Sequence, residues 1–313
     1  MKILFLRGKA DRPKDIAYPD IERCLDTWEQ LAFWMTEPQD MAKVMYWGGS
    51  RKVYYADNFS VHWIHDFKNY KGKEPDVIIA RGGFNEYIPI LKQFPKAFKV
   101  WYGANHGVVP RDNIKYDLVL CDSYAQKENA EKHGYKAELF IKPAPLQFCP
   151  QDVPKKYDCL LAAVWPKDER KNVRWVYKTA PKNIKILQVG HSANMKIPKN
   201  VVIKYIEKDR MATAISKCKV VIAPYKSADS CPRIISEALA CGVPVVALKG
   251  INIWHEKYQI AIVSKSEFWG WVNTFVRNNG ILKDDIREYY EKNLSVEKAG
   301  KYLRTLIERH RNG

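Results

Sequence analysis

The sequence lacks the features that mark a membrane-spanning or a disulfide-bonded protein. Its 313 residues contain no apolar run of about 18 residues, so no transmembrane helix is expected. The seven cysteines are scattered, odd in number and without a C-x-x-C pair, which disfavours a disulfide framework and a zinc site. The apolar core of residues 1–8 is too short for a signal peptide and is typical of a first buried strand. We therefore expect a cytoplasmic protein with reduced cysteines.

Several short motifs of nucleotide-binding and hydrolytic enzymes are missing as well. There is no G-x-G-x-x-G motif, which disfavours a dinucleotide-binding protein. The sequence also contains no P-loop, H-E-x-x-H or G-x-S-x-G motif. No cluster of carboxylates has the composition that Mg²⁺ or Mn²⁺ requires. We therefore predict neither a metal site nor a resident cofactor.

Acidic residues are few relative to basic ones. The chain has 52 Lys and Arg against 35 Asp and Glu, a formal net charge of +17. Residues 151–250 carry 19 basic and 8 acidic side chains, whereas residues 1–150 carry 22 and 19. Such a surplus suits nucleic acid, an anionic membrane surface or a phosphorylated substrate, and a merely solvated basic face explains it equally well.

Apolar strand patterns alternate with amphipathic segments along the whole chain, which predicts an α/β fold with parallel sheets. Strands are predicted at 2–7, 43–47, 53–56, 76–80, 98–103, 117–121, 138–142, 158–164, 184–189, 200–205, 219–224, 243–248 and 259–263. Helices are predicted at 19–35, 87–94, 123–134, 172–180, 210–218, 232–241 and 266–279. Two such sheets in succession indicate two Rossmann-like domains.

A proline-rich segment separates the two halves. Pro143, Pro145, Pro150 and Pro154 fall close together, where neither a helix nor a central strand can form. We predict an N-terminal domain at 1–145, a second domain at 146–282 and C-terminal helices at 283–313.

The most informative segment is 229–248, which is typical of a loop, a capped helix, a glycine stop and a buried strand. Ser230 can cap the helix, and Gly242 stands where a helix-ending glycine belongs. A helix start offers free backbone N–H groups to a phosphate. Asp229 precedes this start and Glu237 follows eight residues later. Two carboxylates beside an anion site suit a ligand that also carries hydroxyls, as a nucleotide sugar does.

That segment resembles the E-x7-E signature of the retaining GT-B glycosyltransferases, the group 1 family of lipopolysaccharide and phosphatidylinositol mannosyltransferases. The resemblance implies that Glu237 binds the nucleotide ribose and Asp229 contacts the transferred sugar. Asp229 stands where the family usually has Glu, so its reach is one methylene shorter. The donor phosphates are assigned by resemblance to the loop and helix start formed by Ser230, Cys231, Pro232 and Arg233.

The same resemblance implies a GT-B architecture, in which two Rossmann-like domains face a central cleft and the last helix crosses back onto the N-terminal domain. His106 follows the strand 98–103 and matches the family's histidine over the donor sugar. A structural histidine is the competing interpretation. The nucleotide sugar is implied as a co-substrate, and the absence of D-x-D argues against a metal-dependent GT-A enzyme.

Further donor contacts are expected after the other strands. Lys171 matches a family lysine on the donor diphosphate, and Lys167 or Arg170 could replace the family arginine, whose position falls on Pro166. Such cations would stabilise the leaving phosphate. The remaining assignments by resemblance are a close backbone approach at Gly190 and His191, the nucleobase at Tyr205 and Ile206, and a phosphate loop at Gly8.

The sequence does not identify the molecule that accepts the sugar. The near-neutral balance of residues 1–150, the expected acceptor half, favours a glycan or a lipid-linked saccharide, with peripheral contact to an anionic membrane possible. Trp28, Trp34, Trp47 and Trp63 are candidates for stacking on sugars, core packing being the alternative. The other hypotheses are a phage-type transferase acting on hydroxymethylated pyrimidines of DNA, a catalytically lapsed binding protein and a sugar-nucleotide epimerase.

Overall fold

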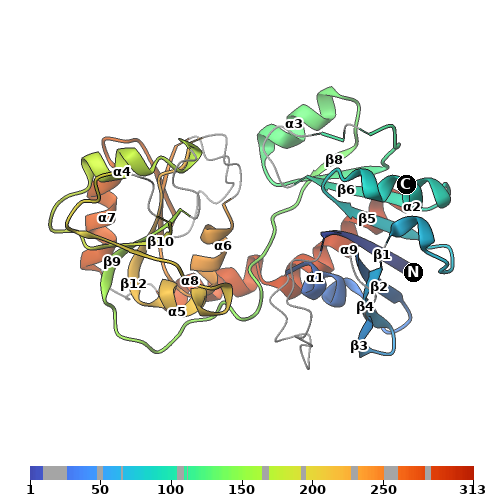
Figure 1. Ribbon diagram of the computed structural model, residues 1–313, viewed down its shortest axis with the longest axis horizontal. Helices are drawn as coiled ribbons and strands as arrows, with labels where there is room; N and C mark the ends of the chain where they lie inside the picture. The colour runs from blue at the N-terminus through green and yellow to red at the C-terminus, as the bar shows by residue number, and fades with distance from the viewer. Residues whose placement is uncertain are drawn as a thin grey trace. The chain divides into compact units, whose positions relative to one another are not determined.

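The chain divides into two compact units in the computed structural model. Unit 1 comprises Met1–Ile141 with Val296–Gly313, and unit 2 comprises Lys142–Ser295 (Figure 1). The structure describes residues 1–9, 27–47, 52–64, 66–103, 109–110, 112–163, 169–191, 195–226, 232–249, 260–278 and 283–313. In this part of the chain no helix is long and apolar enough to cross a membrane.

Unit 1 is built on an eight-stranded sheet in the order β3-β4-β2-β1-β5-β6-β7-β8. The strands are β1 Lys2–Lys9, β2 Met41–Trp47, β3 Lys52–Ala56, β4 Phe59–Ile64, β5 Val77–Arg81, β6 Phe98–Gly103, β7 Leu118–Cys121 and β8 Ala137–Leu139. All neighbours pair in parallel except β3 and β4, because the short turn between those two permits only an antiparallel hairpin. β4 was not predicted from the sequence. Its residues alternate between apolar and polar types, a weaker signal than the continuous apolar runs of β5 and β7.

The helices of unit 1 pack around this sheet (Figure 1). They are α1 Thr27–Met35, α2 Ile88–Gln93, α3 Tyr124–Lys132 and α9 Val296–Asn312, with short 3-10 turns η1 Phe67–Asn69 and η2 Asn85–Tyr87. The Ser123 hydroxyl accepts a hydrogen bond from the Gln126 N–H at 3.2 Å and so caps α3, as its position in the sequence predicts.

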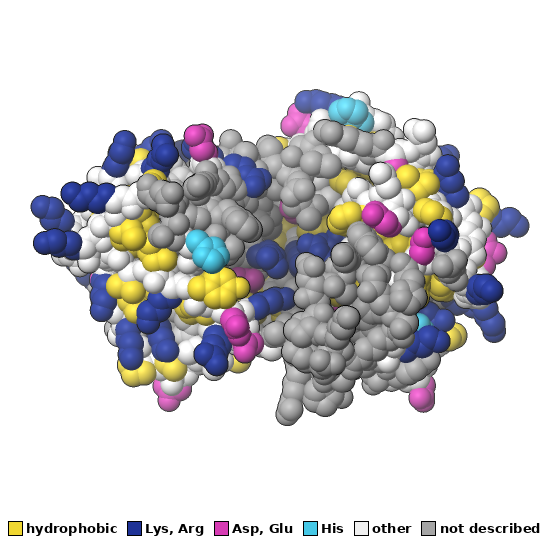
Figure 2. All heavy atoms as spheres, viewed as in Figure 1, with side chains coloured by type: hydrophobic (Ala, Val, Ile, Leu, Met, Phe, Trp, Pro, Cys, Tyr) yellow, Lys and Arg dark blue, Asp and Glu magenta, His cyan; other side chains and the backbone are white. Residues whose placement is uncertain are grey.

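Unit 2 contains a six-stranded, fully parallel sheet in the order β11-β10-β9-β12-β13-β14. Its strands are β9 Tyr157–Ala163, β10 Ile186–Gly190, β11 Val201–Lys204, β12 Cys218–Ala223, β13 Val245–Leu248 and β14 Ile260–Val263. Its helices are α4 Val173–Thr179, α5 Met211–Ser216, α6 Arg233–Ala240, α7 Phe268–Arg277 and α8 Lys283–Asn293, with 3-10 turns η3 Glu169–Lys171 and η4 Lys208–Arg210. The α/β class with two parallel sheets is confirmed. On the face seen in Figure 2, Lys and Arg side chains outnumber Asp and Glu over unit 2.

The C-terminal segment is shared between the units, with the boundary at Ser295 and Val296. α8 belongs to unit 2, and α9 returns to unit 1, where it packs on α1. The packing is close because α9 presents Gly300 to the α1 backbone beside Trp34. The sequence predicts a helix break at residues 293–295, and the structure has the break there. The predicted C-terminal segment begins at residue 283, whereas in the structure α8 stays with unit 2 and only α9 joins unit 1.

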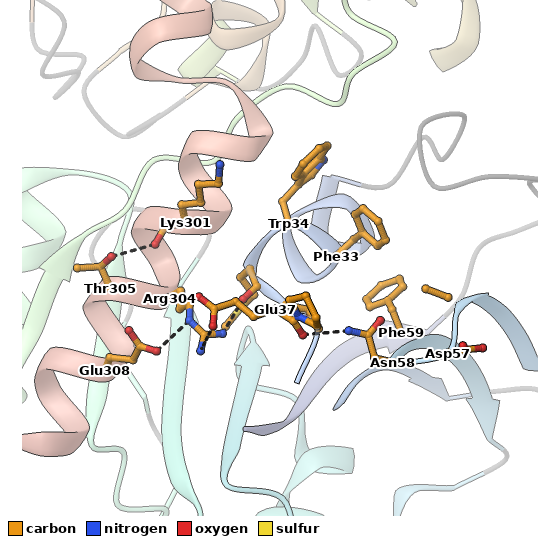
Figure 3. A pocket seen from close by; sticks show the side chains of 14 residues that line it. Phe33, Trp34, Glu37, Asp57, Asn58, Phe59, Lys301, Arg304, Thr305 and Glu308 are labelled. Atoms are coloured by element: carbon orange, nitrogen blue, oxygen red, sulfur yellow. Dashed lines mark hydrogen bonds and ion pairs between the residues drawn. The ribbon is translucent and has the colours of Figure 1, made fainter. Parts of the chain in front are cut away.

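Polar contacts also fasten α9 to unit 1. Arg304 bonds Asp40, and its guanidinium lies 3.1 Å from the Glu37 carboxylate and 2.9 Å from that of Glu308. Arg304, Glu37 and Glu308 line a recess of about 820 Å³ beside the β3–β4 turn (Figure 3). Because Arg304 and the carboxylates around it satisfy one another, we assign this recess a structural role.

Candidate functional site

The order of strands creates a switch point in unit 2. From β9 the chain continues to β10 and β11 on one side of the sheet and then to β12, β13 and β14 on the other. Because β9 and β12 are neighbours, the loops after these two strands diverge at the carboxyl edge. In open α/β sheets such a point is where ligands bind.

Lys171 lies at this switch point. Its ammonium nitrogen is 4.2 Å from the centroid of the Tyr225 ring, which belongs to the loop after β12. The Tyr225 hydroxyl donates to the Ala162 carbonyl at 2.7 Å, so the ring itself is fixed to β9. The backbone carbonyl of Arg170 accepts a hydrogen bond from the Lys226 N–H at 2.8 Å, which joins the loop after β9 to the loop after β12. The structure therefore places both predicted cations at the carboxyl edge.

Asn172 gives the loop after β9 its turn. Its φ of 52° is left-handed, a conformation that Asn adopts more readily than most residues. Its side-chain amide donates to the Pro224 carbonyl at 3.0 Å and so ties this loop to the loop after β12. Lys167, the other predicted cation, lies outside the described residues.

Glu237 projects from α6, the helix that follows β12. Its side chain is half-buried. Desolvation raises the pKa of this carboxyl, and the positive charges of Arg233, Lys208 and Lys142 oppose the shift. Within the described part of the chain, no residue forms a hydrogen bond or an ion pair with this carboxylate. A desolvated carboxylate among cations, with free acceptor oxygens, is suited to a ligand that carries hydroxyl donors.

α6 begins later than the sequence suggests. Pro232 occupies the N-cap position with φ −62° and ψ 118°, in place of the predicted Ser230. Pro232 has no side-chain oxygen, so the first N–H groups of α6 receive no side-chain cap. Gly242, with φ +68°, ends the helix as predicted. Besides Lys167, four predicted site residues lie outside the described residues: His106, Asp229, Ser230 and Cys231.

His191 and Tyr205 meet at the ends of β10 and β11. Their ring centroids are 5.3 Å apart, and Tyr205 is 68% exposed. The backbone carbonyl of His191 accepts from the buried Gln188 amide at 3.2 Å. Gly190 turns with a φ of +135°, which favours glycine. Ile206 is half-buried beside Tyr205, so both predicted nucleobase residues lie near this edge.

Gly8 does not lie in a loop, contrary to the sequence prediction. β1 continues to Lys9, and its pairing with β2 shifts register between Arg7 and Lys9. A glycine inside a strand often marks such a bulge. The predicted phosphate loop at Gly8 is therefore wrong in its local structure, because parallel pairing extends past this residue.

Two arginines that the sequence did not single out lie at the switch point of unit 1, where β1 and β5 are neighbours. Arg7 is near the end of β1, with its guanidinium carbon 5.6 Å from the Tyr46 ring centroid. Arg81 ends β5, with its guanidinium carbon 6.0 Å from the Trp28 ring centroid. Neither belongs to a motif, and only their positions at the ends of adjacent strands could have indicated them.

Exposed aromatic side chains also occur at the carboxyl edge of unit 1. Phe84 follows β5 and is 42% exposed, and Tyr124 follows β7 and is 59% exposed. Trp28, a sequence candidate for sugar stacking, is 1% exposed and packs against Tyr102 and Phe140, so it belongs to the core. Trp34 packs against α9, and the structure does not describe the side chains of Trp47 and Trp63.

The described residues show no metal site, and several of their cysteine thiols are buried. Among them no group of three or more His, Cys, Asp and Glu could hold a metal ion. Burial raises the pKa of the Cys121 and Cys218 thiols to about 12, so both remain protonated at neutral pH.

Comparisons with known proteins bear on both units. Residues 152–291 match the family described as Glycosyl transferases group 1. No curated protein sequence matches the chain significantly. Similar solved structures include the sucrose-phosphate synthase of Thermosynechococcus elongatus, at 13% identity and a TM-score of 0.69 over 98% of each chain. Anabaena HepE in complex with UDP-glucose is similar at 13% identity and a TM-score of 0.66, over 99% of this chain and 100% of HepE.

A third similar structure is WaaG, a glycosyltransferase involved in lipopolysaccharide biosynthesis. It shows 10% identity and a TM-score of 0.57, over 98% of this chain and 99% of WaaG. These similarities extend over nearly the full length of the chains. They confirm the GT-B fold, with its two Rossmann-like units.

Proposed function

We propose that the chain is a retaining glycosyltransferase, because residues 152–291 match the family described as Glycosyl transferases group 1. In this proposal it moves a sugar from a nucleotide-sugar donor to a hydroxyl group of a glycan or a lipid-linked saccharide. The observation that carries the proposal is Glu237, a half-buried carboxylate without a bonding partner among the described residues, on the helix after β12.

The donor is assigned to the carboxyl edge of unit 2. Glu237 would accept hydrogen bonds from the ribose hydroxyls, and Lys171 and Arg170 would face the diphosphate at the switch point. His191 and Tyr205 would border the nucleobase. A complex of HepE with UDP-glucose supports a nucleotide-sugar donor for this fold. Asp229, His106 and the helix start from Ser230 to Arg233 keep the roles that the family resemblance implies.

The reaction then needs no protein nucleophile. The acceptor oxygen bonds to the anomeric carbon as the bond from that carbon to the donor phosphate breaks, on the same face of the sugar. The hydroxyl proton passes to the departing phosphate, which leaves as a nucleoside diphosphate. Cations near this phosphate lower the barrier because its negative charge increases in the transition state. Since the sequence offers no carboxylate cluster for a metal, we expect activity to survive EDTA.

The acceptor is assigned to the carboxyl edge of unit 1. Phe84 and Tyr124 follow β5 and β7, the two strands that flank β6. Neighbouring strands lie about 4.8 Å apart, so the ends of β5 and β7 are about 10 Å apart. Exposed aromatic rings offer apolar surface to the C–H faces of sugars. This placement supports a saccharide acceptor with more than one ring.

Binding of nucleotides tests the donor site directly. UDP, GDP and ADP are titrated calorimetrically into the wild-type protein, Glu237→Ala and the control Glu288→Ala, which alters an exposed glutamate of α8. We expect one nucleotide to bind the wild type and Glu237→Ala to weaken that binding by about 1–3 kcal/mol, because ribose hydroxyls lose their acceptor. Unchanged affinity in Glu237→Ala would remove this residue from the donor site. Absence of binding by all three nucleotides would contradict the proposal as a whole.

The class of acceptor is tested with the donor identified in this way. Transfer is measured to free saccharides, lipid-linked saccharides and hydroxymethylated duplex DNA. Transfer to a saccharide, reduced in Phe84→Ala and Tyr124→Ala, is the expected result. Transfer to DNA alone would show that the acceptor is assigned to the wrong class.

A further inference from the structure

Unit 2 has a recess beside α5. At one end it shares Tyr205 and Ile206 with the proposed nucleobase site, whereas none of its cationic side chains is assigned to the donor. It has a volume of about 540 Å³ and is lined by the start of β9, the middle of β10, the residues after β11 and the helix α5. We name it the α5 recess. Such a volume lies within the range of small-molecule sites.

Positive charge dominates the walls of the α5 recess. Four cationic side chains line it against one carboxylate, that of Glu207. The four cations are Lys156, Lys204, Arg210 and Lys217. None of them forms an ion pair with a carboxylate of the described residues, whereas nearby Lys219 pairs with Asp158 at 2.9 Å. Clustered like charges repel one another, so an anion bound between them would be stabilised.

Two of the cations are brought together by the sheet. Lys156 precedes β9 and Lys217 precedes β12, and the Lys156 N–H donates to the Lys217 carbonyl at 2.8 Å. Both therefore lie at the amino ends of the parallel strands. Lys171 and Glu237 lie after β9 and β12, near the carboxyl ends. The pair Lys156 and Lys217 is thus separate from the residues assigned to the donor.

The remaining walls suit the organic part of a ligand. Leu187 contributes a buried apolar floor with 2% exposure, and the half-buried Tyr157 and Thr213 supply ring surface and a hydroxyl group. An anion site of this size with an apolar floor fits a phosphate group joined to a small body better than a bare inorganic ion. Phosphate binds well to Lys and Arg because its oxygens accept several charge-assisted hydrogen bonds.

We propose that the α5 recess is a second anion site that binds the phosphate ester of a small molecule or of a lipid headgroup. Both sources present the same chemistry, a phosphate carried on an organic body. The site rests on the described walls of unit 2 alone and does not depend on the proposed transfer reaction.

The test uses the full chain and two probes. Glucose 6-phosphate is the soluble probe, and binding is measured by calorimetry. Vesicles of phosphatidylcholine with and without phosphatidylglycerol are the lipid probe, and binding is measured by cosedimentation. The variant is Lys156→Ala/Lys217→Ala, and the control is Lys182→Ala/Lys199→Ala, which alters two exposed lysines of unit 2 outside the recess.

We expect one probe to bind the wild type and the control alike, and to bind the recess variant at least tenfold more weakly. Binding of glucose 6-phosphate assigns the site to a free phosphate ester, and binding of anionic vesicles alone assigns it to a lipid headgroup. Nucleotide affinity should be the same in all three proteins, which separates this test from that of the donor site. Failure of both probes to bind the wild type, or equal binding by the recess variant, would overturn the proposal.

Discussion

The Lys171 ammonium nitrogen lies 4.2 Å from the centroid of the Tyr225 ring. The two residues belong to the loops after β9 and β12, neighbouring strands at the switch point of unit 2. A cation–π contact of this kind is worth about 0.5–1 kcal/mol at an exposed site, and it orients the ammonium without neutralising its charge. Lys171 is therefore positioned by the fold before any donor phosphate arrives.

Removing the Lys171 charge should slow sugar transfer. We expect Lys171→Ala to lower kcat by about 10²–10³-fold, a typical loss when one group that stabilises transition-state charge is removed. Steady-state kinetics with saturating donor measures this effect. Tyr225→Phe is the control, because it keeps the ring and removes the hydroxyl group that donates to Ala162. A normal kcat in Lys171→Ala would show that the charge does not act on the leaving phosphate.

Donor binding should depend on pH through Glu237. Desolvation raises the pKa of this carboxyl above its usual value of 4.5, so it takes up a proton at a higher pH than an ordinary glutamate. Protonation removes the negative charge and turns one carboxyl oxygen into a donor, which weakens the bonds that the ribose hydroxyls donate. We therefore expect nucleotide affinity to fall as the pH is lowered towards 4.5, and calorimetry over a pH series measures this fall. Glu237→Gln should bind weakly and lose this component of the pH dependence, and an equal slope in both proteins would refute the assignment.

The close packing of α9 on α1 can be tested with two helical glycines. A Cβ at Gly300 would lie 2.8 Å from the Trp34 Cβ and 2.9 Å from the Trp34 carbonyl carbon, so Gly300→Ala should destabilise unit 1 by about 1–3 kcal/mol. Gly270 in α7 has no atom within 4 Å of a Cβ, so Gly270→Ala should stabilise unit 2 by about 0.5–1 kcal/mol. Urea unfolding, followed for each unit by hydrogen exchange, measures both. Equal effects of the two substitutions would contradict the close contact.

Stability should also change with the titration of His62 in β4. Desolvation and the charges of Lys43 and Lys52 lower the pKa of this imidazole from 6.5 to about 4. The unfolded chain therefore binds more protons than the folded chain between these values, so stability is fully present above pH 6.5 and falls as the pH drops towards 4. Urea unfolding of the wild type and His62→Gln over this range tests the effect. The variant should lose this part of the pH dependence, and identical profiles would rule His62 out as its cause.

Parts of the fold could be predicted because they depend on local pattern. The apolar runs of β9, β12 and β13 identify strands buried on both faces, and a helix followed by Gly242 identifies the end of α6. The alternation of strands and helices then favours parallel sheets. β4 was not predicted because its apolar and polar residues alternate and it follows β3 after a very short turn. Such a segment gives a weaker strand signal than a continuous apolar run.

Some residues of the candidate site could also be predicted from local sequence, and others could not. The helix that carries Glu237 was predictable from the apolar residues at helical spacing within it and from the glycine stop at Gly242, since these lie in one short segment. The arginines Arg7 and Arg81 were not, because they are more than 70 residues apart and meet only where β1 pairs with β5. Gly8 was assigned to a loop because local composition does not reveal a bulge inside a longer strand.

The sequence by itself determined the α/β class, the positions of most strands and helices, and the segment that carries Glu237. These features follow from burial patterns and turn residues within a few positions of one another. Only the tertiary structure decided the order of the strands, the contact of Lys171 with Tyr225, the retention of α8 in unit 2 and the cations of the α5 recess. Those features depend on which distant segments pair, and no local periodicity encodes that choice, because pairing is settled by the packing of the whole sheet.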